Sequence, residues 1–351
     1  MQSEIRMEAV INTIFRRFGA LSTRLYSISL LAVISALAFS LSGCDNFPAG
    51  TNSSGSGPTA VAAPIDYAQE KILVGSYNIQ VFGRAKLGKN SVTAILVDVA
   101  RKFDVLAIQE LRSTDQSIVP RFVEMINSTG RKFEYIVGPR QGLTVSTEQY
   151  VYIYDSERVA VISQPAIAND PSGQLHRSPM VARFQFQPAV INEMGERIQI
   201  PDLHNRPGFS FSLMNIHVDP DEVKIEHPAL VQLIQEVRSN EPGEDDFVLA
   251  GDLNAPPRYF EQFDWFENQF AAIPDEWSTK PRQNRNIDNL VFDRIRTAEF
   301  TGETGVMNIQ EIYQLSLEEA LLVSDHYPVW ATFDGLEAPV ASLTRDPKVV
   351  R

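Results

Sequence analysis

The chain has 351 residues, 44% of them hydrophobic, so it can build a packed core and a wholly disordered chain is not expected. Its formal net charge of −13 excludes a global basic field for polyanions, so binding of nucleic acid or phosphate must be local or assisted by cations. A single cysteine, Cys44, excludes an internal disulfide framework and a cysteine-rich zinc site.

The first 43 residues have the order of a secretory signal. Four arginines precede an uncharged run over residues 25–43, which ends in small residues directly before Cys44. Residues 41–44, LSGC, resemble a bacterial lipobox, in which cleavage precedes the cysteine and its sulfur carries the lipid. The sequence therefore predicts removal of residues 1–43 and a lipid anchor at Cys44 that binds the membrane, with the protein in the bacterial cell envelope, facing the periplasm or the exterior. An uncleaved anchor or an incidental cysteine is the alternative.

Composition divides the rest of the chain. Residues 44–66 are rich in Gly, Ser, Pro and Ala, which bury too little surface to fold, so a flexible tether is expected. Residues 67–335 contain no second linker and no repeat of fixed period, which favours one α/β domain. Residues 336–351 are expected to form a loose tail.

Within this domain, short apolar runs alternate with helical patterns. Seven runs rich in β-branched and aromatic residues predict buried strands, at residues 71–79, 104–110, 149–155, 210–218, 246–252, 289–292 and 327–333. Residues 91–102 and 227–238 carry apolar side chains at helical spacing and predict two helices.

Polar side chains stand at or just beyond the carboxyl ends of these strands. They are Asn78, Glu110, His217, Asp252, Asn254, Asp325 and His326. Loops at one edge of an α/β sheet converge on a common crevice, so these residues suggest one site, although each alone could cap an element or bind loop amides. Carboxylates and amide oxygens suit Mg²⁺ or Mn²⁺, and histidines exchange protons near neutral pH. Hydrolysis of a phosphate ester needs both kinds of group.

An ordered set of motifs carries a family resemblance. The motifs are SYNIQVFG, VLAIQELR, EQYVYIYD, HRSPMVARF, NIHVDPDEV, LAGDLNAPP, NIDNLVFD and VSDHYPV, between residues 72 and 333. They resemble the endonuclease/exonuclease/phosphatase superfamily, and most closely its deoxyribonuclease I branch. The resemblance implies a four-layer α/β sandwich, in which two mixed β-sheets pack face to face with helices outside.

The same resemblance implies metal-binding residues. The family's metal-ligand glutamate falls on Glu110, assisted by Asn78, and Asp325 joins the metal-binding shell. Asp252 and Asn254 are implied to contact the attacking water, the phosphate or a second metal.

The two family histidines fall on His217 and His326. The resemblance pairs them with Glu148 and Asp288 respectively, and such a pairing fixes the tautomer of an imidazole and raises its basicity. One histidine would activate water while the other protonates the leaving oxygen or steadies the phosphate. A surface salt bridge or a helix cap is the alternative role for each of these carboxylates.

Substrate contacts are implied for two arginines, with Arg112 in a minor groove and Arg177 on a phosphate. Ser146 stands where deoxyribonuclease I has a groove-stacking tyrosine, and the usual disulfides are missing, which puts efficient cleavage of double-stranded DNA in doubt. A structural Ca²⁺ remains open, because residues 168–174 fall near a calcium loop of that branch. Only Asn169 and Asp170 offer suitable oxygens there, so a plain loop is expected.

Three functions are weighed. The first is a metal-dependent endonuclease that cuts DNA outside the cytoplasm, with divalent cations screening the acidic protein from its polyanionic substrate. The second keeps the chemistry on a phospholipid, as in a sphingomyelinase, or on an inositol phosphate. The third is a non-enzymatic binding lipoprotein, which is disfavoured because every catalytic position holds a competent residue.

Overall fold

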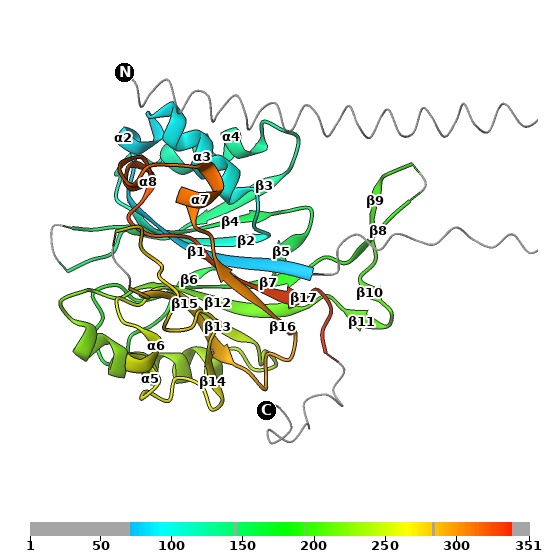
Figure 1. Cartoon of the computed structure of the whole chain (residues 1–351). Coiled ribbons are helices and arrows are strands. Elements are labelled where there is room, and N and C mark those ends of the chain that lie inside the picture. The colour runs from blue at the N-terminus through cyan, green and yellow to red at the C-terminus, as the bar shows by residue number, and fades with distance from the viewer. Residues whose placement is uncertain (1–70, 144–145, 193, 283–284, 339–351) are drawn as a thin grey trace, which may run out of the picture. The chain divides into compact units, whose positions relative to one another are not determined.

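Two β-sheets pack face to face, and helices cover the outer face of each, in the computed structural model of the chain (Figure 1). The structure describes residues 71–143, 146–192, 194–282 and 285–338. The predicted signal, the tether and the lipidation site Cys44 lie outside these residues. In the described part of the chain, no helix combines the length and the apolar character needed to span a membrane.

The first sheet has six strands and contains the first and last strands of the described chain. Its order is β16 (Phe300–Val306), β17 (Val329–Asp334), β1 (Lys71–Phe82), β2 (Val105–Leu111), β4 (Gln149–Asp155) and β3 (Phe133–Val137). Only β1 and β2 pair in parallel, so the sheet is mixed. The parallel pair brings the carboxyl ends of β1 and β2 to the same edge.

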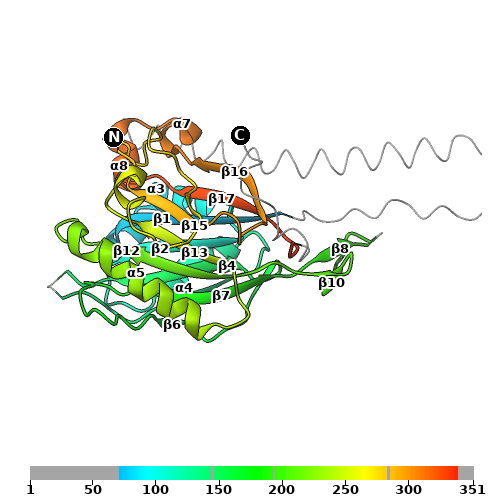
Figure 2. The same ribbon diagram turned by 90° about the horizontal axis from the view of Figure 1, so that it is seen from below.

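The second sheet has seven strands and is also mixed, because β12 and β13 pair in parallel while the others are antiparallel. Its order is β14 (Gln269–Ala271), β15 (Asp288–Asp293), β13 (Phe247–Asp252), β12 (Ser210–His217), β7 (Met180–Phe186) and β5 (Val159–Val161), with β6 (Ala166–Ile167) also on β7. Two short ribbons, β8 (Ala189–Ile191) with β9 (Arg197–Gln199) and β10 (Asp202–Leu203) with β11 (Arg206–Pro207), extend beyond the sheets (Figures 1 and 2).

Helices form the two outer layers. The first sheet carries α2 (Arg84–Leu87), α3 (Asn90–Ala100), α4 (Ile118–Asn127), α7 (Ile309–Tyr313) and α8 (Leu317–Val323), and the second carries α5 (Val223–Asn240) and α6 (Pro257–Phe260). On α5, Leu230, Leu233 and Ile234 are fully buried and pack in one cluster with Ile216 of β12. The helical spacing of these residues thus gives α5 one apolar face, and that face covers the outer side of the sheet.

The layer between the sheets changes character along the strands. Phe211 and Leu213 of β12 point into it and are fully buried, and each contributes roughly 1.5–3 kcal/mol by leaving water. Asn215 continues the same face, and its Oδ1 accepts a hydrogen bond of 2.7 Å from Gln109 of β2 in the opposite sheet. The next residue on this face is His217, the last of the strand. Because side chains alternate along a strand, these four residues of β12 share its inner face, which is apolar in the core and polar at the end of the strand.

The predicted four-layer sandwich is confirmed, and the seven predicted strands and two predicted helices all occur. The predicted tail begins too early, because Leu336 is fully buried and bridges Gly208, and Glu337 accepts a hydrogen bond from the Ser210 amide. Six strands of the two sheets are not predicted from the sequence: β3, β5, β6, β7, β14 and β16. Of these, β3 and β16 lie at sheet edges and are partly exposed, so their apolar patterns are weak.

Candidate active site

His217 ends β12 and forms a buried pair with Glu148, the residue before β4. Its Nδ1 lies 2.8 Å from the Glu148 carboxylate, and the two partners come from opposite sheets. Burial disfavours the imidazolium, but Glu148 and Asp252 together outweigh it and raise the pKa of His217. Burial also acts against the Glu148 anion, but His217 and two arginines prevail and lower the pKa of that carboxyl. The pair fixes the orientation of the imidazole, because Nδ1 contacts Glu148 while Nε2 does not.

His326 forms the second pair, with Asp288 at the start of β15. Its Nδ1 lies 2.9 Å from Oδ2 of Asp288, which also accepts a hydrogen bond of 2.6 Å from the Thr279 hydroxyl. Burial disfavours the charged ring, yet Asp288 and Asp252 prevail and raise the pKa of His326 to about 9. This pair also joins the two sheets, because His326 lies in the loop that leads into β17.

Asp252 lies between the two imidazoles. Its Oδ2 is 3.6 Å from Nε2 of His217 and 3.6 Å from Nε2 of His326, and it accepts a hydrogen bond of 3.0 Å from Asn78. Its Oδ1 accepts from the Asn254 amide at 3.0 Å, in a turn that holds Asn254 at a φ of 49°. The carboxylate is therefore fixed on both oxygens, with both histidines directed to one of them.

Glu110 reaches the site through a local irregularity in β2. The register between β1 and β2 shifts between Asn78 and Phe82, and Glu110 has a φ of 65°. A bulge of this kind changes the direction of a side chain, so that Glu110 points toward the site although regular alternation would direct it away from the site. The Glu110 carboxylate accepts hydrogen bonds from the Val81 amide at 2.7 Å and from Asn78 Nδ2 at 3.3 Å. Asn78 thus meets both Glu110 and Asp252 through its amide nitrogen.

The two predicted substrate arginines differ in exposure. Arg112 lies 3.1 Å from Glu110, and 31% of its side chain is exposed. Arg177 is buried, donates to the His217 carbonyl at 3.2 Å and lies 3.5 Å from Glu148. Arg177 therefore supports the His217–Glu148 pair, and Arg112 is the arginine open to a ligand.

Lys280 also belongs to the site, although no sequence signal indicated it. Its Nζ lies 2.9 Å from Asp325 and 3.1 Å from Nε2 of His326. The loop between β14 and β15 carries this lysine, and loops give no periodic pattern. The Lys280 ammonium group therefore forms an ion pair with Asp325, and its positive charge opposes protonation of His326.

The donor set suits a hard divalent cation. Asp252, Asp288 and His326 offer ligand atoms within 4.8 Å of one another, but Asp288 and His326 are paired with each other. Asp252 therefore remains as an oxygen donor, together with Glu110, which is joined to Asp252 through Asn78, and Asp325, whose Oδ1 lies 3.7 Å from Nε2 of His326. Oxygen-rich sets of this kind are those that Mg²⁺ and Mn²⁺ prefer. The residues present therefore fit such an ion. In the loop over residues 168–174, Asp170 accepts hydrogen bonds from the Ser172 and Leu175 amides.

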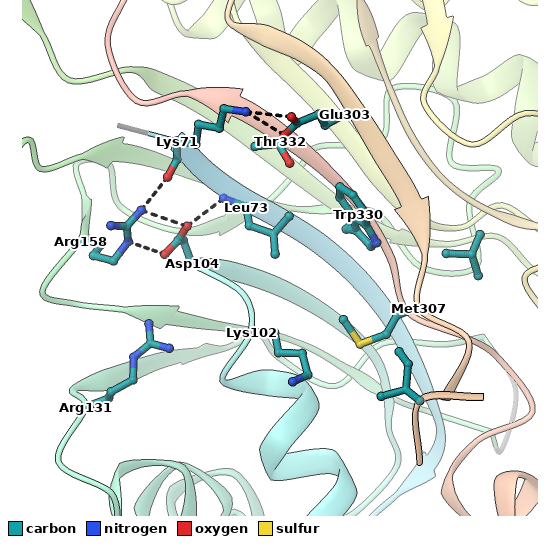
Figure 3. A pocket seen from close by; sticks show the side chains of 12 residues that line it. Lys71, Leu73, Lys102, Asp104, Arg131, Arg158, Glu303, Met307, Trp330 and Thr332 are labelled. Carbon is teal, nitrogen blue, oxygen red and sulfur yellow. Dashed lines mark hydrogen bonds and ion pairs between the residues drawn. The ribbon is translucent and has the colours of Figure 1, made fainter. Parts of the chain in front are cut away.

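A cavity of about 910 Å³ lies elsewhere, on the outer face of the six-stranded sheet (Figure 3). Four of its six charged residues are paired with one another, Lys71 with Glu303 and Asp104 with Arg158. None of the residues that line it belongs to the histidine pairs. This cavity is therefore separate from the candidate active site, which the convergence of titratable groups identifies.

Comparison with known proteins agrees with the fold and identifies the family. The Endonuclease/Exonuclease/phosphatase family matches residues 75–326. Deoxyribonuclease gamma of Rattus norvegicus is 25% identical over 271 residues, covering 72% of this chain and 82% of that protein. Deoxyribonuclease-1-like 2 of Homo sapiens is 27% identical over 280 residues, covering 74% and 91%. The crystal structure of ANGEL2, a 2′,3′-cyclic phosphatase, superposes with a TM-score of 0.51 at 14% identity, covering 76% and 95%, and supports the fold.

Proposed function

The chain belongs to the endonuclease/exonuclease/phosphatase family, whose members hydrolyse phosphoester bonds, and from this we propose that it is a divalent-metal-dependent endonuclease that cleaves DNA. One observation carries the proposal: two histidine–carboxylate pairs direct Nε2 to the same oxygen of Asp252, each at 3.6 Å. Hydrolysis requires one group that takes a proton from water and one that gives a proton to the leaving oxygen. Two oriented imidazoles around one centre supply both.

The proposed mechanism assigns each side chain by its contacts. Glu148 and Asp288 hold the Nδ1 protons of their histidines, so that Nε2 of each ring is the atom that exchanges a proton with the substrate or with water. One ring removes a proton from the attacking water, and the other protonates the departing ester oxygen. Asp252 orients the water between them, and Asn254 anchors the turn that holds Asp252. Burial of the two pairs and of Asp252 excludes bulk water.

A divalent ion, Mg²⁺ or Mn²⁺, would be held by Glu110, Asp325 and Asp252, with Asn78 positioning two of these carboxylates. When bound, it would offset negative charge on the phosphoryl oxygens and the leaving group. Its requirement is part of the proposal, and removal with EDTA should abolish turnover, with activity restored by added Mg²⁺ or Mn²⁺.

DNA is proposed as substrate on two grounds. Relatives that span most of the domain are named deoxyribonucleases. Arg112 is partly exposed beside Glu110, where a planar guanidinium can donate to a phosphate or a base edge. The acidic chain makes binding weak without cations, which fits a degradative enzyme without sequence preference.

The purified protein tests the proposal on three substrates in parallel. It is expected to nick supercoiled plasmid with Mg²⁺ or Mn²⁺, and EDTA should stop the reaction. Sphingomyelin and inositol phosphates serve as the other arms. Turnover of either of these, with plasmid left intact, would contradict the DNA assignment and retain the phosphoesterase chemistry. Inertness toward all of them would favour a binding role.

We further propose that the protein is lipid-anchored at Cys44 in the bacterial cell envelope, on the sequence evidence of the LSGC motif. Metabolic labelling with a fatty acid should mark the wild type and not Cys44→Ser, and the variant should leave the membrane fraction. Equal labelling of both would contradict the anchor.

A further inference from the structure

A second group of acidic side chains lies at the end of the sandwich opposite the histidines. Asp246 directly precedes β13, Glu299 directly precedes β16, and Glu337 follows β17. Each offers a carboxylate oxygen within 4.8 Å of the others. The register of β1 with β17, which pairs Lys71 with Asp334, puts this group beside the amino end of β1, whereas the catalytic residues lie beyond its carboxyl end.

Within the part of the chain that the structure describes, two oxygens of this group have no hydrogen-bond partner. Oδ1 of Asp246 and Oε2 of Glu299 are both buried without a donor, in side chains that are 2% and 5% exposed. Their neighbours are engaged: Oε1 of Glu299 accepts from the Ala338 amide at 2.5 Å, and Oε1 of Glu337 accepts from the Ser210 amide at 2.7 Å. A buried carboxylate oxygen without a donor costs free energy that a ligand can recover.

The positive side chains nearby do not neutralise the group. Arg183 is held by Glu244, with 2.6 Å between Nε and the carboxylate, and Arg206 donates to the carbonyls of Leu336 and Glu337. Among the described residues, no lysine or arginine forms an ion pair with Asp246, Glu299 or Glu337. Burial and then the charge of Glu299 raise the pKa of Asp246, which reflects the repulsion that remains.

We propose that Asp246, Glu299 and Glu337 bind a structural divalent cation of the Ca²⁺ class. Carboxylate oxygens are the ligands this ion prefers, and its flexible coordination tolerates side chains from three separate loops, while Mg²⁺ demands closer to ideal octahedral geometry. The ion would satisfy both unpaired oxygens and offset three converging charges. Because Asp246 belongs to one sheet and Glu299 and Glu337 to the other, the ion would bind the two sheets together at this end.

The experiment uses the full chain, freed of metals with EDTA and then titrated with CaCl₂, with the melting temperature and the calorimetric binding isotherm as readouts. Ca²⁺ is expected to raise the melting temperature of the wild type. Glu299→Gln should abolish that rise and weaken Ca²⁺ binding at this site at least tenfold. In EDTA the same variant should melt at or above the wild type, because it loses one of the repelling charges. Asp246→Asn should behave alike and guards against a fault peculiar to one substitution.

Two controls separate this site from the catalytic centre. Glu110→Gln alters the proposed catalytic metal site and should keep the thermal response to Ca²⁺. Glu124→Gln changes an exposed carboxylate of α4 and should also keep it. No response to Ca²⁺ in the wild type would overturn the proposal. So would a response that survives in Glu299→Gln and Asp246→Asn but disappears in Glu110→Gln, because the ion would then be at the catalytic centre.

Discussion

His217 and His326 approach the same oxygen of Asp252, each with its Nε2 3.6 Å away. Each ring is held from behind by a carboxylate, at 2.8 Å for Glu148 and 2.9 Å for Asp288. The centre is thus nearly symmetric in its chemistry, although its residues come from separate parts of the chain. Such symmetry suits a reaction in which a proton is removed on one side of a phosphorus atom and delivered on the other.

Replacing Asp252 with asparagine should reduce kcat by about 10³-fold or more, because the carboxylate faces both proton-exchanging nitrogens. Asparagine retains an oxygen for the Asn254 amide, so the melting temperature should change little. Plasmid nicking and circular dichroism measure the two effects. A variant that keeps a tenth or more of wild-type activity would contradict the central role of Asp252.

The carboxylates behind the histidines should act on kcat more than on KM. Glu148→Gln and Asp288→Asn remove the charge that fixes each imidazole, and each should lower kcat by about 10²- to 10⁴-fold. Asp155→Asn is the matched control, since Asp155 is also buried and also paired, with Arg131, but lies at the far end of β4. This control should lose stability and retain kcat. Equal kcat losses in all three variants would indicate a structural effect only.

Lys280 should control the protonation of His326. Its ammonium group lies 3.1 Å from Nε2 and opposes a positive charge on the ring, so Lys280→Met should raise the pKa of His326 further. The limb of the pH–rate profile that reports this histidine should then move to higher pH, and Lys280→Arg should leave it near its wild-type position. Profiles of kcat/KM against pH test this, and an unmoved limb in Lys280→Met would contradict it.

His326 should also make stability depend on pH. Its pKa is raised from 6.5 to about 9 in the folded chain, so the folded state binds this proton more tightly than the unfolded state. The resulting stabilisation is complete below about pH 6.5 and is lost as the pH rises through 9. In EDTA, the difference in unfolding free energy between wild type and His326→Gln should therefore shrink by roughly 1–3 kcal/mol across that range. A difference in unfolding free energy that grows with pH would contradict a raised pKa of His326 in the folded state.

The sequence predicted well what depends on regular spacing. The inward faces of the strands, and the polar residues at their carboxyl ends, follow from period-two alternation, so Asn78, His217 and Asp252 could be expected at one edge of the sandwich. The helix over residues 227–238 occurs within α5, which begins earlier and continues through Pro228.

The rest depends on irregular backbone and on contacts between distant segments. Glu110 reaches the site through a bulge and a positive φ that no periodic pattern reveals. Lys280 lies in a loop, and Asp246, Glu299 and Glu337 meet only after three separate strands have been placed. The contacts of Arg177 with Glu148 and the His217 carbonyl also follow only from the packed structure, and its contact with a phosphate stays a prediction.

Each histidine–carboxylate pair has one member from each sheet. Catalytic activity therefore reports whether the two sheets have docked. Glu148 and His326 belong to segments of the six-stranded sheet, while His217 and Asp288 belong to the seven-stranded sheet. A folding intermediate in which both sheets have formed but have not yet docked would keep its secondary structure and lack both histidine–carboxylate pairs. During refolding, catalytic activity should therefore recover when the sheets dock rather than when they form. Where such an intermediate accumulates, activity should recover later than the far-ultraviolet circular dichroism signal.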